Sequence, residues 1–469
     1  MPINSFLYPG AKVTLAYEVA NSCRFNDGDS AAMSKSSTTL TNDKKFTISA
    51  WCKRGALSGS GQFPIFGHIS DSNNANKNCQ IGFYNDALYM AYVDGGSVTV
   101  NKVTNALYRD PSAWMHVMVA VDSTQGTAAN RNRFYVNGTE VTSFSTDTNS
   151  GSDETFLATS CTITVGKYSN TSGTASYFDG YLAEVVYIDG LQLTPSSFGE
   201  FDEDSPTIFK PIDVSGLTFG NNGFYLDFEA SANLGNDANG GTDLTEANLA
   251  ATDSSTDTPT NSFCTLNPLD NYYPASTFSE GNCKIATNAS NQTFNTGTIG
   301  LSTGKWYWEA YLTTAGGEES IGITDIVSTG TGIYGGKTAN SYSFKGNNGD
   351  IRNNDSNASY GNAYAQDVVI GVALNLDDNE IKFYKDGTVE NSGTAHSITA
   401  PASTSTGLYF PMFGDVDTDS VVWSVNFGGS PAFTVSSGNA DANGYGNFEY
   451  SVPSGFLSLC TKNLGSDGG

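Results

Sequence analysis

The stretch Val368–Gly387, VVIGVALNLDDNEIKFYKDG, limits most strongly what this chain can fold into. Its apolar side chains recur at every second position, at Val368, Ile370, Val372, Leu374 and Leu376. A period of two places them on one face of a half-buried β-strand and argues against a helix. The polar residues 377–379 predict a tight turn, a return strand begins at 381, and 385–387 predict a second turn.

A second hairpin of the same design lies in the first half of the chain. Val117, Val119 and Val121 alternate along one strand, and FYVNG (Phe134–Gly138) parallels FYKDG at 383–387. A chain of 469 residues is too long for one ordinary core, so two related modules in tandem are predicted. The 51 Gly residues suit short strands joined by turns, and no segment predicts a long amphipathic helix. The predicted fold class is all-β, with two tandem antiparallel β-sandwich domains.

The charge balance is strongly acidic, because 22 Lys and Arg stand against 48 Asp and Glu, a net charge of −26. No basic stripe is present in the sequence, so neither nucleic acid nor an anionic membrane is an expected partner. The seven Cys residues form no Cys-x-x-Cys motif, which disfavours a zinc site and predicts small buried side chains. A signal peptide and an apolar run of about 18 residues are both missing, so neither export by the usual route nor membrane insertion is expected.

Residues 21–200 resemble a laminin G-like, concanavalin A-type jelly roll. The ordered strand patterns that carry the resemblance are TISAW, W..V.V..D, FYVNG, ITVGKY and FDGYLAEVVYIDGLQLTPSSF. The resemblance implies a β-sandwich, and it implies that calcium is bound by Asp side chains and carbonyl groups of the loops.

Residues 279–432 resemble the SPRY domain. Five elements occur in the order of that family: GKWYWE, YSFKGNNGDI, the hairpin from IGVALNLD to FYKDG, YFP and VNFG. The resemblance implies a second sandwich whose binding surface is made by loops. Gln366-Asp367 stand where a typical SPRY domain has Gly-Asp, a departure that does not threaten the fold.

Three further segments resemble structural proteins of tailed bacteriophages, particularly marine ones: FDGYLAEVVYIDGLQLTPSSFGEFD, DTPTNSFCTLNPLD and SVPSGFLSLCTKNL. This resemblance implies a virion protein that is assembled in the host cytoplasm. The expected divisions are an N-terminal arm (1–20), a laminin G-like sandwich (21–200), a turn-rich connector (201–278), a SPRY-like sandwich (279–432) and a C-terminal extension (433–469). The arm is expected to dock to another virion protein.

Catalysis is not predicted. Glycan cleavage would need two carboxylates that face one bond, and the nearest candidate, Asp227-x-Glu229, lacks a further acidic member. Glu184 and Asp189 are separated by an odd number of positions and are predicted on opposite faces of a strand. No nucleophile motif accompanies the three His residues. The chain is therefore expected not to be an enzyme.

The candidate ligand-binding residues lie in predicted loops, beside Asn and Gly, and they are Tyr334, Asn353, Asn354, Tyr360 and Tyr364. An exposed Tyr ring stacks on a sugar or peptide while neighbouring amides form hydrogen bonds. The SPRY resemblance points to the same loops. The alternative is that these are ordinary loop aromatics folded back onto the sandwich.

Asp27, Asp29 and Asp237 are the candidate calcium ligands, since they supply hard oxygen atoms at close spacing in Asn- and Asp-rich loops. Such runs more often form turns without a metal, which is the alternative here. No other cofactor is expected to be required.

Together these patterns predict a non-enzymatic phage surface protein, a tail fibre or head fibre that binds a host-surface glycan or protein through its sandwich loops. Other virion proteins are the further expected partners. A homo-oligomer is expected, with a trimer the state that suits a fibre, and repeated copies on a virion would convert weak contacts into avidity. Two alternatives stay open: a structural decoration or adaptor protein of the capsid or tail, and a glycan-cleaving enzyme.

Overall fold

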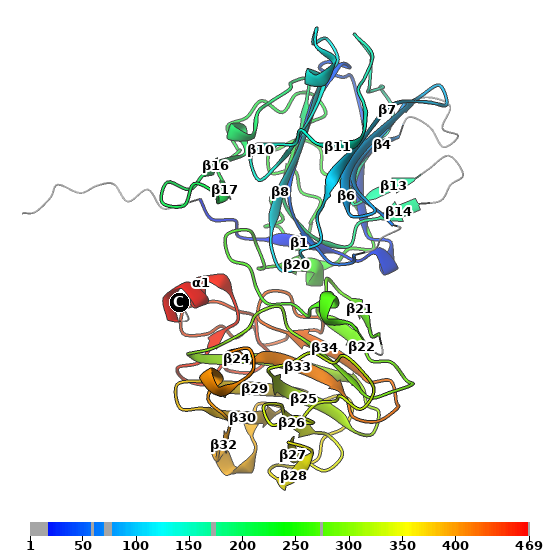
Figure 1. The fold of residues 1–469 in the computed structure, drawn as a ribbon. Coiled ribbons are helices and arrows are strands. Elements are labelled where there is room, and N and C mark those ends of the chain that lie inside the picture. Colours follow the sequence, from blue (N-terminus) through cyan, green and yellow to red (C-terminus); the bar gives the residue numbers. More distant parts are fainter. Residues whose placement is uncertain (1–16, 58–60, 70–76, 170–174, 273–274, 468–469) are drawn as a thin grey trace, which may run out of the picture.

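The computed structural model describes residues 17–57, 61–69, 77–169, 175–272 and 275–467. These residues form two β-sandwiches, one above the other, with the short helix α1 (Thr461–Asp467) at the end of the chain (Figure 1). The predicted all-β fold class is confirmed. The expected N-terminal arm, residues 1–20, lies outside the described residues except for 17–20.

Two eight-stranded antiparallel sheets make the first sandwich. One sheet contains, in spatial order, β10 (Thr139–Glu140), β9 (Asn132–Val136), β8 (Met115–Asp122), β3 (Lys45–Arg54), β15 (Gly180–Asp189), β1 (Ser22–Phe25) and β20 (Ser254–Ser255), with β18 (Phe224–Leu226) paired to β15. The other contains β11 (Phe144–Thr148), β7 (Ser97–Leu107), β6 (Ala87–Asp94), β5 (Asn78–Tyr84), β4 (Gln62–Ile69), β12 (Thr162–Val165), β2 (Ala32–Ser36) and β19 (Thr245–Ala247). Two hairpins stand beside these sheets, β13 (Lys167–Ser169) with β14 (Ala175–Tyr177) and β16 (Gly199–Phe201) with β17 (Phe209–Pro211).

A nine-stranded and a six-stranded sheet make the second sandwich. The larger contains β21 (Thr277–Ser279), β22 (Lys284–Ala286), β34 (Val422–Asn426), β24 (Lys305–Thr314), β29 (Val369–Asn375), β30 (Glu380–Lys385) and β31 (Thr388–Val389), with β32 (His396–Ser397) paired to β30 and β35 (Leu457–Ser458) paired to β24 in parallel. The smaller contains β23 (Thr293–Thr296), β33 (Phe410–Asp415), β25 (Glu319–Thr324), β26 (Tyr342–Lys345), β27 (Asp350–Asn353) and β28 (Ser356–Ser359). Single 3₁₀ turns are η1 (Asp27–Asp29), η2 (Ala128–Asn130), η3 (Pro195–Ser197), η4 (Ala251–Asp253), η5 (Pro268–Asp270), η6 (Asn391–Gly393) and η7 (Pro401–Ser403).

The predicted hairpin at 368–387 forms, as the paired strands β29 and β30. Val372 and Leu374 are fully buried between the two sheets, as their alternation predicts. The expectation that this strand is only half-buried is wrong, because the opposite face is covered as well. There Ala373 packs with Tyr307 and Phe448, and Phe448 belongs to the segment between β34 and β35.

The first sandwich has the same arrangement. Val117, Val119 and Val121 of β8 point into its core, whereas Met118 on the other face is covered by Phe198 and other apolar residues that follow β15. The segment expected as a connector, residues 201–278, supplies β18, β19 and β20, which extend both sheets of this sandwich. In each module, therefore, chain that follows the predicted sandwich covers the outer face of one sheet.

All seven Cys side chains are buried and free, which confirms the prediction that they act as small hydrophobic residues. Burial raises the pKa of the Cys52 thiol to about 12, so this side chain is neutral at any ordinary pH. Among the described residues, none of the helices has the length and apolar character needed to cross a membrane.

A buried ion pair lies where the first sandwich leads into the second. The ammonium group of Lys53, on β3, lies 2.7 Å from a carboxylate oxygen of Asp257, and each side chain is only 1% exposed. The same ammonium donates to the carbonyl of Phe263, at 2.8 Å, where the chain enters the second sandwich. The other oxygen of Asp257 accepts hydrogen bonds from the Trp114 indole and the Phe263 amide. The contacts of Lys53 and Asp257 thus connect β3, a middle strand of the first module, to the segment that leads into the second module.

Arg24 on β1 makes a second cross-module link. Its guanidinium donates to the Pro431 carbonyl, at 3.1 Å, and lies 3.1 Å from Glu280 and 3.2 Å from Asp253. Tyr181, which is fully buried, donates to the Gly281 carbonyl at 2.9 Å. Both donors are shielded from water, so their bonds to Pro431, Glu280 and Gly281 oppose separation of the modules.

We predict that Asp257→Asn lowers the free energy of unfolding of the whole chain by about 3–5 kcal/mol, because the amide leaves a buried ammonium unpaired. Chemical denaturation measures this loss. The matched control is Asp153→Asn at the exposed pair Lys44–Asp153, where the side chains are 32% and 63% exposed and the expected change is at most about 1 kcal/mol. Equal changes in the two variants would contradict the role given to the buried pair.

Candidate functional site

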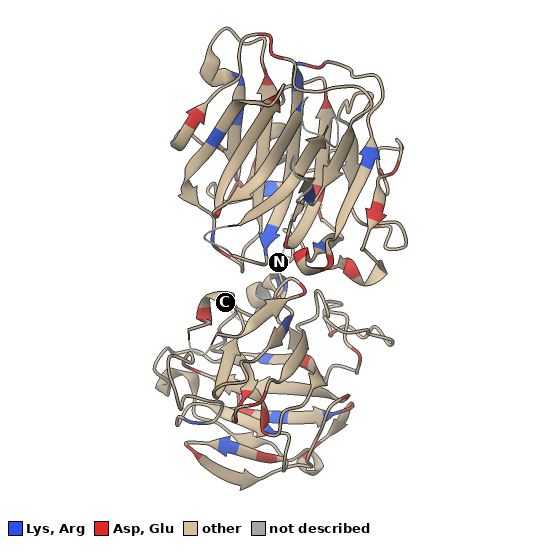
Figure 2. Cartoon of the chain, turned by 90° about the vertical axis from the view of Figure 1, so that its right-hand side faces the viewer, with Lys and Arg blue, Asp and Glu red and all other residues tan. Residues whose placement is uncertain are grey.

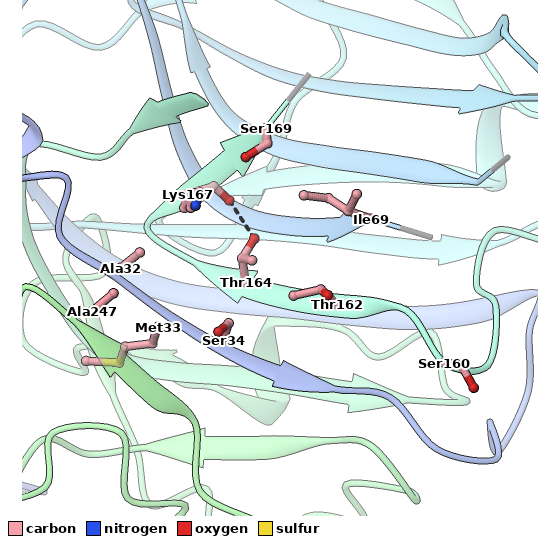
Figure 3. A pocket seen from close by; sticks show the side chains of 10 residues that line it. All are labelled: Ala32, Met33, Ser34, Ile69, Ser160, Thr162, Thr164, Lys167, Ser169 and Ala247. Carbon is pink, nitrogen blue, oxygen red and sulfur yellow. Dashed lines mark hydrogen bonds between the residues drawn. The ribbon is translucent and has the colours of Figure 1, made fainter. Parts of the chain in front are cut away.

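A groove of about 480 Å³ lies on the outer face of the first sandwich, where β2, β12 and β13 meet (Figure 3). We call it the hydroxyl groove, and its lining consists of Ala32, Met33, Ser34, Ile69, Ser160, Thr162, Thr164, Lys167, Ser169 and Ala247. Half of these ten residues are Ser or Thr. A volume of this size falls within the range of small-ligand pockets.

Strand register brings the hydroxyl groups together. Ile163 and Val165 of β12 are fully buried in the core, so the alternating Thr162 and Thr164 are on the outer face. Thr164 is paired with Ser34 of β2 on one side and with Gly67 of β4 on the other. The groove is therefore a direct consequence of the Thr-x-Thr pattern in β12.

Because Gly67 has no side chain, the backbone of Lys167, at one wall of the groove, can lie close to the sheet. A Cβ atom there would lie 2.4 Å from the hydroxyl of Thr164 and 2.7 Å from the carbonyl of Lys167. Without that atom, the Thr164 hydroxyl donates to the Lys167 carbonyl at 2.6 Å, the bond drawn in Figure 3. The ammonium of Lys167 lies 5.5 Å from the ring centre of Tyr177, which places a single positive charge at this wall. Such a lining can both donate to and accept from a neutral polar ligand.

The five candidate ligand-binding residues are placed differently from the expectation. Tyr360 and Tyr364 are 7% and 4% exposed and form part of the core of the second sandwich, where Tyr364 donates to the Phe344 carbonyl at 2.8 Å. Tyr334 is 9% exposed, and its hydroxyl bonds to Asp355. The expectation that these three rings are exposed is wrong, since each folds back onto the sandwich as the alternative stated.

The two asparagines remain nearer the surface. The side-chain amide of Asn353 donates to the carbonyls of Ala339, at 2.8 Å, and Ser341, at 3.0 Å, so it fastens one loop to another. Asn354 is exposed in the turn between β27 and β28, with a left-handed φ of 50°. Tyr334 and Asn354 thus belong to one loop cluster, whereas Tyr360 and Tyr364 serve the core.

The candidate calcium ligands do not form a common site. Asp27 and Asp29 lie in η1, where the amide of Asn26 donates to Asp29 at 2.8 Å. Asp237 belongs to a separate turn, in which its Oδ1 accepts from the amides of Tyr225 and Asn239. Among the described residues, no group of three or more His, Cys, Asp or Glu is arranged to hold a metal ion. These side chains therefore do not fit a calcium site as they stand, and calcium binding stays a prediction.

The sequence indicates Glu184 only as a strand carboxylate and does not predict its surroundings. Glu184 sits at a β-bulge in β15 with a left-handed φ of 49°, and its Oε2 accepts from the hydroxyls of Tyr225, at 2.8 Å, and Tyr17, at 2.9 Å. Burial, together with the nearby charges of Asp227 and Glu229, raises its pKa to about 7, although the two hydroxyl bonds act in the opposite direction. The β-bulge directs the Glu184 side chain to the outer face. The spacing of Glu184 and Asp189 in the sequence does not reveal that a bulge is present.

A Cys–His contact is also present but is not arranged for nucleophilic chemistry. The Sγ atom of Cys161 lies 2.6 Å from Nε2 of His68, and both side chains are buried. Burial lowers the pKa of His68 to about 4 and raises the pKa of Cys161. Both groups are therefore neutral near pH 7, and the thiolate that attacks in cysteine enzymes is not formed.

Lys and Arg are spread over the strands and loops of both modules, with Asp and Glu among them (Figure 2).

Comparisons with known proteins find two domains in the positions that the fold suggests. Residues 26–195 match the family model described as the concanavalin A-like lectin/glucanases superfamily, and residues 305–428 match the SPRY domain. No curated protein matches the chain. The expectation of a laminin G-like module followed by a SPRY-like module is confirmed.

Similar solved structures include the SPRY domain of human HERC1, with 12% identity, a TM-score of 0.28, and coverage of 34% of this chain and 96% of that one. A SAP-like pentraxin from Limulus polyphemus has 17% identity and a TM-score of 0.29, and the match covers 38% of this chain and 80% of that one. A human SPRY domain has 15% identity, a TM-score of 0.24, and coverage of 30% and 90%. Together the two domain matches indicate a module that binds protein or glycan, a class that is generally non-catalytic.

We predict that Glu184 makes stability depend on pH. Because its pKa is about 7 in the folded chain and 4.5 is its ordinary value, the folded state favours the neutral carboxyl. Its contribution is complete below pH 4.5 and is lost as the pH rises to about 7. Glu184→Gln removes this titration, so between these limits the wild-type protein should lose stability relative to the variant in denaturant titrations. Parallel pH profiles for the two proteins would contradict the assignment.

Proposed function

We propose that this chain is a phage virion surface protein, a tail fibre or head fibre, that binds a host-surface glycan or protein without cleaving it. The hydroxyl groove is the observation that supports the binding role most directly, because it presents several hydroxyl groups at fixed positions on a rigid sheet. The sequence resemblance of residues 178–202 to phage structural proteins supports the virion role. The groove would hold a polar ligand by hydrogen bonds, and repeated copies on a particle would supply avidity.

Sugar hydroxyls suit this groove. Each Ser or Thr hydroxyl donates one hydrogen bond and accepts others, so Thr162, Ser34 and Ser160 can satisfy a ligand of the same chemistry. Single contacts of this kind are weak, since they replace bonds to water. A multivalent assembly, such as the trimer expected from the sequence, would make them useful.

We predict that Thr162→Trp weakens binding through the hydroxyl groove, because the exposed Thr162 side chain borders the groove and an indole would fill it. Binding to a panel of immobilised bacterial surface polysaccharides should fall by about tenfold or more, the size of effect that one blocked central contact produces. The control is Thr148→Trp, an exposed Thr on β11 of the same sheet and outside the groove. Equal binding by both variants would remove the groove from the account.

The two rival functions give different results in the same preparation. If the carboxyl of Glu184 acted with Asp227 in glycan cleavage, incubation would shorten the polysaccharide, and Glu184→Gln would stop the shortening. A decoration or adaptor protein would bind none of the polysaccharides. Electron microscopy of intact particles would then show the hydroxyl groove covered by neighbouring virion proteins.

A further inference from the structure

A second groove, of about 530 Å³, lies on the outer face of the nine-stranded sheet. Its floor is one row of paired residues across four neighbouring strands, Lys284 of β22, Ser424 of β34, Tyr311 of β24 and Val369 of β29. We call it the aromatic groove. The loop cluster of Tyr334 and Asn354 belongs to the six-stranded sheet of the same module, so the loop cluster and the aromatic groove are on opposite sheets.

Two aromatic walls border this groove, and both come from the segment between β34 and β35. Phe433 stacks against Tyr311, with ring centres 5.8 Å apart and an interplanar angle of 30°. Tyr450 lies over Gly387, where a Cβ atom would be 2.5 Å from its ring. Both Tyr311 and Tyr450 are only partly buried, so aromatic surface borders the open groove.

The charge of the groove is negative. Asp367, Asp386 and Glu449 line it, against the single cation Lys284. Asp367 accepts from the Tyr311 hydroxyl at 2.6 Å, and Asp386 accepts from the Val369 amide at 2.9 Å, so each carboxylate is held through Oδ1. Among the described residues, none donates a hydrogen bond to the Oδ2 atom of Asp367 or Asp386.

The backbone fixes these two carboxylates. Asp367 and Asp386 both have left-handed φ angles, 68° and 47°, which Asp and Asn adopt more readily than other side chains. The amide of Asp367 donates to the Leu312 carbonyl at 3.0 Å, and that of Asp386 donates to the Val369 carbonyl at 2.8 Å. Both side chains are thus held at the groove before any ligand arrives, which reduces the entropy lost on binding.

We propose that the aromatic groove binds a protonated amine carried by a sugar, an inference that rests on the proposed function and names a ligand class for a second site. Carboxylates and aromatic faces are the two kinds of group that attract an ammonium ion. Aromatic faces also pack against the C–H groups of a sugar ring. Thr313 and Thr434 line the groove, where their hydroxyl groups would form hydrogen bonds with sugar hydroxyls.

The floor favours a sugar over a peptide strand. β24 is hydrogen-bonded to β34 on one side and β29 on the other, so its backbone has no free edge to which an extended peptide could add. Side chains must therefore make the specific contacts in this groove. This is what a sugar needs when it binds through its amine and hydroxyl groups.

The test compares a glucosamine trisaccharide that has free amines with its fully N-acetylated counterpart, titrated calorimetrically into the full chain at about pH 6, where an amine is protonated. The free-amine sugar should bind about tenfold more tightly, and the preference should shrink as salt is added. The double variant Asp367→Asn and Asp386→Asn should lose this preference. It should keep the folding temperature of the wild type, since Asn tolerates the same backbone angles and retains the accepting oxygen.

Asp378→Asn is the matched control. Asp378 is an exposed carboxylate in the β29–β30 turn and does not line the groove, so the preference for the free amine should survive there. Equal affinity for the two trisaccharides would overturn the inference, as would binding of a Lys-containing peptide but of neither sugar. A chain that binds bacterial polysaccharide through the hydroxyl groove but shows no amine preference overturns this inference alone. A chain that binds none of these probes overturns the proposed function as well.

Discussion

The ion pair between Lys53 and Asp257 is the contact on which the arrangement of the two sandwiches depends. Removing an ammonium and a carboxylate from water costs several kcal/mol for each ion, so such a pair persists only with a full set of partners. Here Trp114, Ser262 and Phe263 provide them, from both sides of the boundary. Moving the second module away would draw Ser262 and Phe263 from the buried Lys53 ammonium, and this cost opposes separation of the two modules.

A fixed arrangement of the modules has a consequence for binding. The hydroxyl groove and the aromatic groove are each built on the outer face of a sheet, one in each sandwich. Grooves held at a constant separation and orientation lose little freedom when a ligand binds to them. In the second sandwich the covering segment also supplies Phe433 and Tyr450 as walls of the aromatic groove.

Much of the fold could be predicted from sequence, because period-two alternation directly reports strand faces. Val372 and Leu374 are in the core as predicted. The covering of the opposite face could not be predicted, since the segment that carries Phe448 is rich in Gly and Asn and has no periodicity that reveals where it packs. For the same reason Tyr360 and Tyr364 were expected on the surface: turn-forming neighbours predict a loop but not the direction of its rings. The Thr-x-Thr alternation of β12 was a sequence signal from which the hydroxyl groove could have been predicted. No sequence pattern indicated the bulge at Glu184.

Calorimetric unfolding of the full chain tests most directly whether the two sandwiches form one rigid binding body. Because the buried pair and the links made by Arg24 couple the modules, we predict a single transition whose calorimetric and van't Hoff enthalpies agree. Two separate transitions, one for each sandwich, would contradict the account.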